Sequence, residues 1–249
     1  MRNSILALAI LIISISVSGQ IVPTNDSVVN QKSQTQLNAT YFILGTLSDY
    51  LGRFYYVNNP DQVDRYFPYE KLLMEFLDSL IFDELNIKIN VNERDETYSK
   101  DLSILVNSFY GNDKLLIDSL FIDNDQIFSF LTGKYYRYGR VINDSLFKIQ
   151  LANSPNHKIC DTLLKKAGCK NVYFIYLKNI PAQFIYYFVP PPELKDYFNS
   201  ISAQKEILDD AYYRVIKDLM KYEEEELEVM KRDDRQRDLS RFLEIINKQ

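Results

Sequence analysis

The sequence contains no tryptophan, a single histidine, two cysteines and only seven glycines in 249 residues. No two of these glycines have the spacing of a GxGxxG or GxxxxGK motif, which excludes nucleotide sites where the backbone at several glycines approaches a phosphate. One imidazole cannot supply the two or three histidines that common catalytic zinc sites use. We therefore expect neither a cofactor nor a metal ion.

The overall charge is acidic, because 29 Lys and Arg stand against 34 Asp and Glu, which gives a net charge of −5. An acidic protein has little attraction for a phosphate backbone, so this balance predicts that nucleic acid is not a partner. The hydrophobic content of 46% and the charged content of 25% are ordinary globular values. They indicate a folded chain.

The N-terminal segment has the pattern of a secretory signal peptide. Arg2 precedes an apolar run from Ile5 to Val17, and the small residues Ser18 and Gly19 follow. The run is shorter than the about twenty residues that a transmembrane helix needs. We expect a signal peptide at 1–19 cleaved before Gln20, a secreted or periplasmic localisation and no stable membrane span after cleavage; an uncleaved anchor is the alternative.

Residues 20–36 are mainly Asn, Gln, Ser and Thr, with few large apolar side chains. Such a segment buries too little apolar surface to offset its ordering entropy, which predicts a flexible polar leader. Asn25, Asn38 and Asn143 each open an N-x-S/T triplet. These triplets matter only if the host glycosylates them.

Residues 37–190 are predicted to form an α+β core domain, with helices packed on a mostly antiparallel sheet. Apolar residues that recur at three and four positions predict helices within 37–54, 72–85 and 102–109. Alternating or continuous apolar runs predict strands at 87–91, 147–151, 172–177 and 184–189. Between 134 and 152, two β-prone runs flank Asn143-Asp144-Ser145, which predicts a hairpin.

Residues 191–249 are predicted to be a long, charged helical extension. Pro190, Pro191 and Pro192 end the sheet, and 23 of the 45 residues from Lys205 to Gln249 are charged. A continuous helix of that length would measure about 65 Å, so its distal half should protrude, turn back or pack on a partner. The apolar residues Leu239, Phe242, Ile245 and Ile246 need a cover, either the seam at 208–219 or another molecule. We expect the chain beyond Tyr222 to be dispensable for core folding and to promote association, including self-association.

The single histidine and the two cysteines offer two candidate sites, a catalytic pair and a disulfide. His157 and Cys160 could form a nucleophilic pair, but no spacing here matches a common zinc pattern. Cys160 and Cys169 could instead form a disulfide, as exported proteins favour. Helical spacing between them would place their Cα atoms about 13 Å apart, too far for a bond. A disulfide is nevertheless the prediction, provided that the helix frays.

The segment from Lys134 to Arg140 mixes cations with aromatic residues. On a strand, Tyr136, Tyr138 and Arg140 would share one face and could bind a glycan or an anionic peptide. Tyrosines and arginines also simply suit a half-exposed strand. These three residues are the candidate binding site.

Two SxxK tetrads, Ser145–Lys148 and Ser202–Lys205, lack the other motifs of serine enzymes of that class, and chance explains them. The sequence resembles no family known to us. The resulting interpretation is an exported, non-catalytic binding or assembly protein of the cell envelope or extracellular space, with a protein or glycan partner. The alternative is an envelope hydrolase that uses carboxylates or the neighbourhood of His157 and Cys160.

Overall fold

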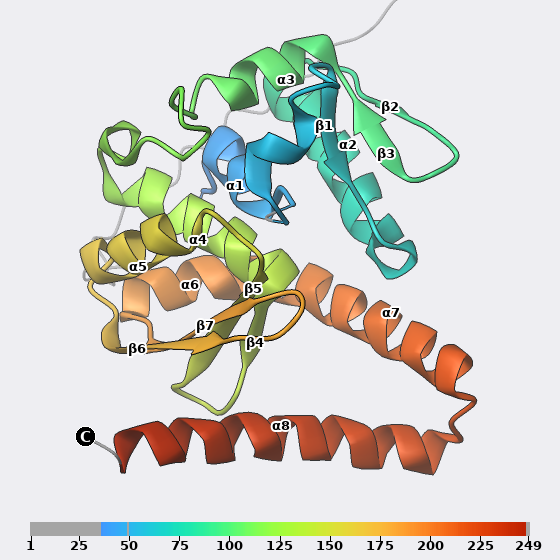
Figure 1. Ribbon diagram of the computed structural model, residues 1–249, viewed down its shortest axis with the longest axis vertical. Coiled ribbons are helices and arrows are strands. Elements are labelled where there is room, and N and C mark those ends of the chain that lie inside the picture. The colour runs from blue at the N-terminus through green and yellow to red at the C-terminus, as the bar shows by residue number, and fades with distance from the viewer. Residues whose placement is uncertain (1–35, 49, 248–249) are drawn as a thin grey trace, which may run out of the picture. The chain divides into compact units, whose positions relative to one another are not determined.

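The computed structural model describes residues 36–48 and 50–247 (Figure 1). Within them the chain forms eight α-helices and two antiparallel sheets, which confirms the predicted α+β class and the long C-terminal helix. The helices are α1 (Ala39–Thr46), α2 (Lys71–Leu85), α3 (Lys100–Asn107), α4 (Asn124–Tyr138), α5 (His157–Lys166), α6 (Pro192–Ser200), α7 (Ser202–Met220) and α8 (Glu224–Ile246). Short 3₁₀ helices are η1 (Gly52–Tyr56), η2 (Pro68–Glu70) and η3 (Asp118–Leu120).

The strands make one small and one larger sheet. The small sheet has the order β1-β3-β2, from β1 (Gln62–Arg65), β2 (Asn90–Val91) and β3 (Glu96–Tyr98). The larger sheet has the order β4-β5-β7-β6, from β4 (Gly139–Val141), β5 (Phe147–Ala152), β6 (Lys170–Leu177) and β7 (Gln183–Val189). All neighbouring strands are antiparallel.

Helices α1 and α4 pack closely against each other because each has a glycine at their contact. A Cβ atom on Gly45 would lie 2.2 Å from the carbonyl oxygen of Phe130. A Cβ atom on Gly133 would lie 2.2 Å from the carbonyl oxygen of Phe42. Any side chain at either position would push the helices apart. This close packing brings the end of α4, with Arg137 and Tyr138, beside the end of α1.

The larger sheet has one face in the main core and one face toward α8. Ile149 and Phe188 lie in the main core, which α4, α5 and α6 complete. On the opposite face, Ile185 and Tyr187 belong to a smaller apolar cluster that includes Phe242 of α8. Successive side chains of β5 and β7 point to opposite faces of the sheet, so one face packs in the main core and the other packs against α8.

Helix α8 turns back beneath the larger sheet (Figure 1). Helix α7 ends at Met220, and Lys221 has a left-handed backbone with φ 56°. Glu223 and Glu226 then form a capping box that starts α8. The ring of Phe242 lies 5.5 Å from that of Tyr173 and 5.6 Å from that of Tyr187. The prediction offered three arrangements for the end of the helical extension, and the structure shows that the chain turns back. The larger sheet, rather than the seam at 208–219, covers Phe242 and Ile245.

The predicted strand at Lys134–Tyr138 is wrong, because α4 continues through these residues. A capping box between Asp123 and Gln126 starts α4, and packing of Tyr136 against Phe42 and Phe76 outweighs the β propensity of its tyrosines. Gly139 ends the helix in an extended conformation. The hairpin itself exists, with its turn at the predicted position between β4 and β5.

Other boundaries also differ from the predictions. The helix within 37–54 stops at Thr46, and the strand at 87–91 shrinks to the exposed β2. Strand β1 was not predicted, because four residues give no clear period. Helix α6 lies within the helical extension predicted at 191–249, but the sequence did not show it as a separate helix. The strands at 172–177 and 184–189 are confirmed as parts of β6 and β7.

The predicted signal peptide at 1–19 and almost all of the leader at 20–36 lie outside the described residues, and the localisation stays a prediction. Within the described part of the chain, no helix has the length and apolar content to cross a membrane. Cys160 and Cys169 are not joined by a disulfide. The reason is that α5 remains helical through Lys166, so the fraying that the prediction required does not occur.

Candidate functional site: a cationic cleft

A buried ionic cluster stands at the end of α4. Its members are Arg137, Asp64 and Glu70, here called the Arg137 cluster. The guanidinium of Arg137 donates to Asp64 Oδ2 at 2.7 Å and to the two oxygens of Glu70 at 2.8 Å each. It also donates to the carbonyl oxygens of Thr46 and Arg65, at 2.9 and 2.8 Å. The side chain of Arg137 is only 1% exposed.

The Arg137 cluster joins α1, β1, η2 and α4 with a full set of contacts. Burial opposes the charge of Arg137, but Asp64 and Glu70 outweigh it and raise the pKa of the guanidinium well above its ordinary value. Five guanidinium N–H groups are all that an arginine has, and these contacts use them. This arginine is therefore a structural link.

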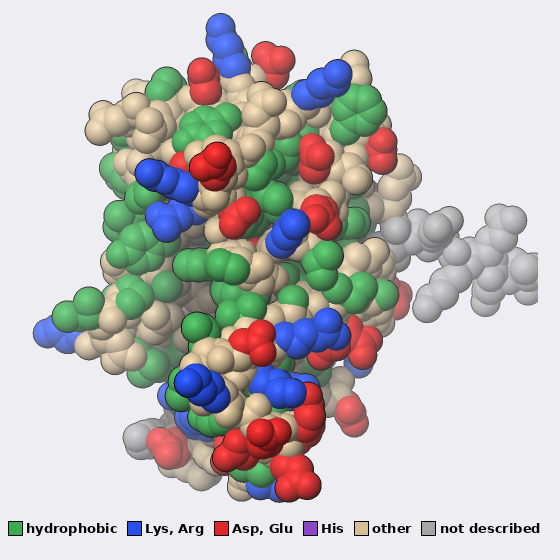
Figure 2. Space-filling view, turned by 90° about the vertical axis from the view of Figure 1, so that its right-hand side faces the viewer, with side chains coloured by type: hydrophobic (Ala, Val, Ile, Leu, Met, Phe, Trp, Pro, Cys, Tyr) green, Lys and Arg blue, Asp and Glu red, His purple; other side chains and the backbone are tan. Residues whose placement is uncertain are grey.

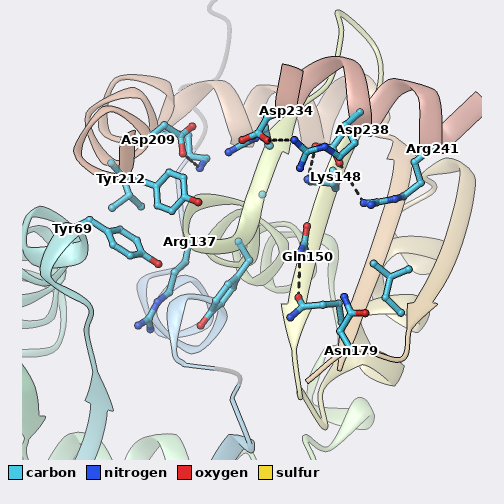
Figure 3. A pocket seen from close by; sticks show the side chains of 18 residues that line it. Tyr69, Arg137, Lys148, Gln150, Asn179, Asp209, Tyr212, Asp234, Asp238 and Arg241 are labelled. Carbon is cyan, nitrogen blue, oxygen red and sulfur yellow. Dashed lines mark hydrogen bonds and ion pairs between the residues drawn. The ribbon is translucent and has the colours of Figure 1, made fainter. Parts of the chain in front are cut away.

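Beside this cluster lies a cavity of about 460 Å³ between the outer face of β4 and β5, helix α7 and helix α8. We call it the cationic cleft (Figure 3). Besides Arg137, it is lined by five cations and three carboxylates, an excess of two positive charges. The cations are Arg140, Lys148, Lys205, Arg237 and Arg241, and the carboxylates are Asp209, Asp234 and Asp238.

The two lysines of the cleft are firmly paired. Lys148 Nζ lies 2.5 Å from Asp238 Oδ2, and Tyr187 Oη donates to the other oxygen of Asp238 at 3.2 Å. Lys205 Nζ lies 2.6 Å from Asp209 Oδ1 within α7. Burial lowers the pKa of both lysines, and the carboxylate beside each opposes that shift. The first pair anchors α8 to the sheet, the second lies within α7, and both leave the lysines little capacity for a ligand.

The three arginines of the cleft are held more loosely. Arg140 lies 3.8 Å from Asp234, and Arg241 lies 3.9 Å from Asp238. Both distances exceed the about 2.7–3.2 Å of an N–H···O hydrogen bond. Arg237 lies 3.2 Å from the same Asp234 and is 65% exposed. Because these guanidiniums share two carboxylates, they keep donors that an incoming anion can use.

Figure 2 shows charged side chains of both signs gathered over the lower part of that face, where α8 lies. In α8 the lining residues are Asp234, Arg237, Asp238 and Arg241, at spacings of three, one and three. This spacing puts them on one side of the helix. The spacing of these four residues is visible in the sequence. The pairing of Asp238 with Lys148, 90 residues away, depends on the turn at Lys221.

The structure separates the three predicted binding residues. Tyr136 is buried in the core against Phe42 and Phe76 and does not face the cleft. Tyr138 and Arg140 both line the cleft, since the chain changes from helix to strand at Gly139 between them. Helical geometry, rather than strand alternation, directs Tyr136 inward.

The neighbourhood of His157 and Cys160 has no catalytic geometry. The ring of His157 stacks on Phe184 with centroids 4.1 Å apart, and its Nδ1 lies 2.9 Å from the carbonyl oxygen of Ser154. Cys160 is fully buried in the core. The two SxxK tetrads are also structural, since Lys148 pairs with Asp238 and Lys205 pairs with Asp209. No group of three or more His, Cys, Asp or Glu side chains in the described residues could hold a metal ion.

No protein-family model matches the chain, and no curated protein matches it. Among solved structures, the chain is similar to three structures of the homing endonuclease I-DmoI. A variant in complex with its target DNA has a TM-score of 0.39 and 14% identity, over 66% of this chain and 91% of that chain. A mesophilic variant has a TM-score of 0.41 and 14% identity, over 66% and 88%. The complex with DNA and Ca has a TM-score of 0.37 and 14% identity, over 66% and 87%.

The similar structures are of a homing endonuclease, two of them in complex with DNA, and they stand against the predicted non-catalytic binding or assembly protein and against its envelope-hydrolase alternative. The predicted export stays a prediction. The same structures stand against the predicted exclusion of nucleic acid, whereas the protein or glycan partner and the self-association stay predictions. The net charge of −5 averages over a chain that gathers an excess of positive charge in one cleft, so the total charge does not describe this surface.

Proposed function

We propose that this protein binds a single strand of nucleic acid through the cationic cleft. The observation that carries the proposal is the set of three arginines, Arg140, Arg237 and Arg241, whose guanidiniums share two carboxylates at 3.2 to 3.9 Å. Guanidinium groups with spare donors bind phosphate oxygens bidentately. The phosphodiester backbone supplies such oxygens at every nucleotide.

The size of the cleft favours a single strand over a duplex. Its volume of about 460 Å³ lies in the usual range for small-molecule sites, about 300–1,000 Å³. Helix α8 crosses the outer face of the larger sheet and contacts it through Phe242 and Ile245. A duplex would need that face uncovered, whereas one extended strand can follow the cleft between α7 and α8.

The cleft also contains aromatic rings beside its cations. Tyr69, Tyr138 and Tyr212 line it, and Tyr69 and Tyr212 contact each other edge to face at 5.2 Å. Cations that follow a backbone and rings that contact bases are the combination that single-stranded nucleic acids require. The carboxylates of Asp234 and Asp238 compete for the same arginines, so we expect modest affinity with strong salt dependence.

Fluorescence anisotropy with a labelled oligodeoxythymidylate of about twelve nucleotides tests the proposal, since this length lies within typical single-strand sites. At low salt we expect saturable binding with Kd in the range of about 10⁻⁶–10⁻⁴ M. The double variant Arg140→Gln/Arg237→Gln should weaken binding about tenfold or more, because each lost charged contact removes about 1 kcal/mol.

The matched control is Lys166→Gln, which removes one exposed positive charge on α5, outside the cleft. It should leave the affinity within about twofold, since it alters net charge but no cleft residue. Absence of saturable binding by the wild type, or equal weakening by the control and by the cleft variant, would refute the proposal.

A further inference from the structure

A second pocket adjoins the cationic cleft and has a different chemistry. Its volume is about 380 Å³, and six of its twelve lining residues are aromatic. We call it the aromatic pocket; its rings are Tyr50, Tyr55, Tyr56, Phe67, Tyr69 and Tyr138. Three of its residues, Tyr69, Arg137 and Tyr138, also line the cationic cleft. The two cavities are therefore continuous in their walls.

The rings of the pocket come from separate parts of the chain, and all but the buried Tyr56 stay partly exposed. Tyr55 belongs to η1 and is 41% exposed, while Phe67 precedes η2 and is 57% exposed. The rings of Phe67 and Tyr69 are nearly parallel, with 3° between their planes and centroids 5.7 Å apart. Exposed rings gathered around one hollow are a feature of ligand sites rather than of a packed interior.

The polar groups at the base of the pocket are already engaged. The Arg137 cluster forms part of the wall, and the guanidinium of Arg137 donates all its hydrogen bonds to Asp64, Glu70 and backbone carbonyls. The hydroxyl of Tyr55 accepts a hydrogen bond from Arg65 at 3.3 Å. A ligand would therefore meet mostly ring faces, which suits a flat, unsaturated group of low charge.

We infer that the aromatic pocket receives an unstacked nucleobase of the strand whose phosphates lie in the cationic cleft. This inference rests on the proposed function and adds the part of the ligand that the arginines do not contact. The ring faces match a flat base, the cations of the adjoining cleft match the phosphates of the strand, and the two cavities share Tyr69, Arg137 and Tyr138 in their walls. Because the contacts are to ring faces, the pocket accepts any base with little preference.

Two oligomers of equal length and charge test this inference: an oligodeoxythymidylate, and a chain of abasic deoxyribose phosphates. The wild type should bind the thymidylate about 5–150-fold more tightly, which is the contribution of stacking one base on aromatic side chains. The double variant Tyr55→Leu/Phe67→Leu keeps apolar volume but removes two ring faces. It should reduce that preference at least about fivefold, because the rings of Tyr69, Tyr138 and Tyr212 remain, and it should leave the affinity for the abasic chain unchanged.

Phe82→Leu is the matched control, since Phe82 is a comparably exposed ring on α2 that lines neither cavity. It should retain the full preference. If the wild type binds both oligomers equally and with salt dependence, the cleft proposal stands and the base pocket is refuted. If Tyr55→Leu/Phe67→Leu keeps the preference, the pocket is likewise refuted. If neither oligomer binds, the proposed function itself fails and the inference fails with it.

Discussion

Arg137 and Arg140 lie three residues apart at the junction of α4 and β4, yet their environments are opposite. The first has a side chain that is 1% exposed and makes five hydrogen bonds; the second is 24% exposed and has one ion pair at 3.8 Å. An arginine with all its donors used stabilises a fold, and one with spare donors can bind an anion. Position in the sequence and residue type alone do not distinguish the two.

The largest effect should come from removing the buried arginine. Arg137→Met leaves Asp64 and Glu70 buried without their cation, and we expect it to lower the free energy of unfolding by about 3–5 kcal/mol. Urea unfolding monitored by circular dichroism measures this. Arg137→Lys, which keeps the charge but not the fork of donors, should recover only part of the loss. A loss below about 1 kcal/mol in Arg137→Met would show that the Arg137 cluster is not a structural link.

The next largest effect concerns the pair that holds α8 on the sheet. Lys148→Met leaves Asp238 nearly buried without its closest cation and should cost about 1.5–3 kcal/mol. The double variant Lys148→Met/Asp238→Leu should regain part of that loss, because an apolar pair of similar volume avoids the desolvation penalty, although Tyr187 and Arg241 lose their contact with Asp238. Equal destabilisation in the single and double variants would contradict this account of the Lys148–Asp238 pair.

The free energy of unfolding should also depend on pH through Tyr66, whose ring lies beside Arg137. Burial, and then the charge of Asp64, raise the pKa of Tyr66 well above its usual value near 10. A raised folded-state pKa means that this contribution to stability is complete below pH 10 and is lost as the pH rises above 10. Between pH 10 and 11 the loss from Tyr66 should be about 1 kcal/mol, and Tyr66→Phe should remove that share. Identical pH slopes in wild type and variant would disprove the shift.

The smallest effect on stability should come from the partly buried Arg140. Arg140→Met breaks one long ion pair with a side chain 23% exposed, so the free energy of unfolding should change by less than about 0.5 kcal/mol. Thermal unfolding beside Arg137→Met makes the comparison direct. Similar melting shifts in the two variants would remove the distinction between the two arginines.

Local sequence patterns predicted much of the fold. The apolar runs at 172–177 and 184–189 mark the centre of the larger sheet, and Asn143-Asp144-Ser145 marks its hairpin turn. The pattern failed at Lys134–Tyr138, where five aromatic or cationic residues have no preference strong enough to resist packing in α4. Tertiary contact decided the structure there.

Most of the candidate site could not be predicted from the sequence. Tyr138 and Arg140 were recognised, but their partners Asp234, Arg237 and Arg241 come from α8, about 100 residues away. A single turn at Lys221 brings them together, and its left-handed backbone occurs at a lysine rather than at the glycine that would signal it. The total charge likewise does not reveal the cationic cleft, because it does not depend on which charges the fold brings together.

The salt dependence of oligonucleotide binding tests the central claim most directly, that the cleft arginines contact phosphates. For single strands the logarithm of the binding constant falls against the logarithm of salt concentration with a slope of about −0.7 per phosphate contact. Three arginines predict a slope near about −2 for the wild type, and Arg140→Met should reduce it to about −1.4. A wild-type slope near zero, or a slope unchanged by Arg140→Met, would contradict the account.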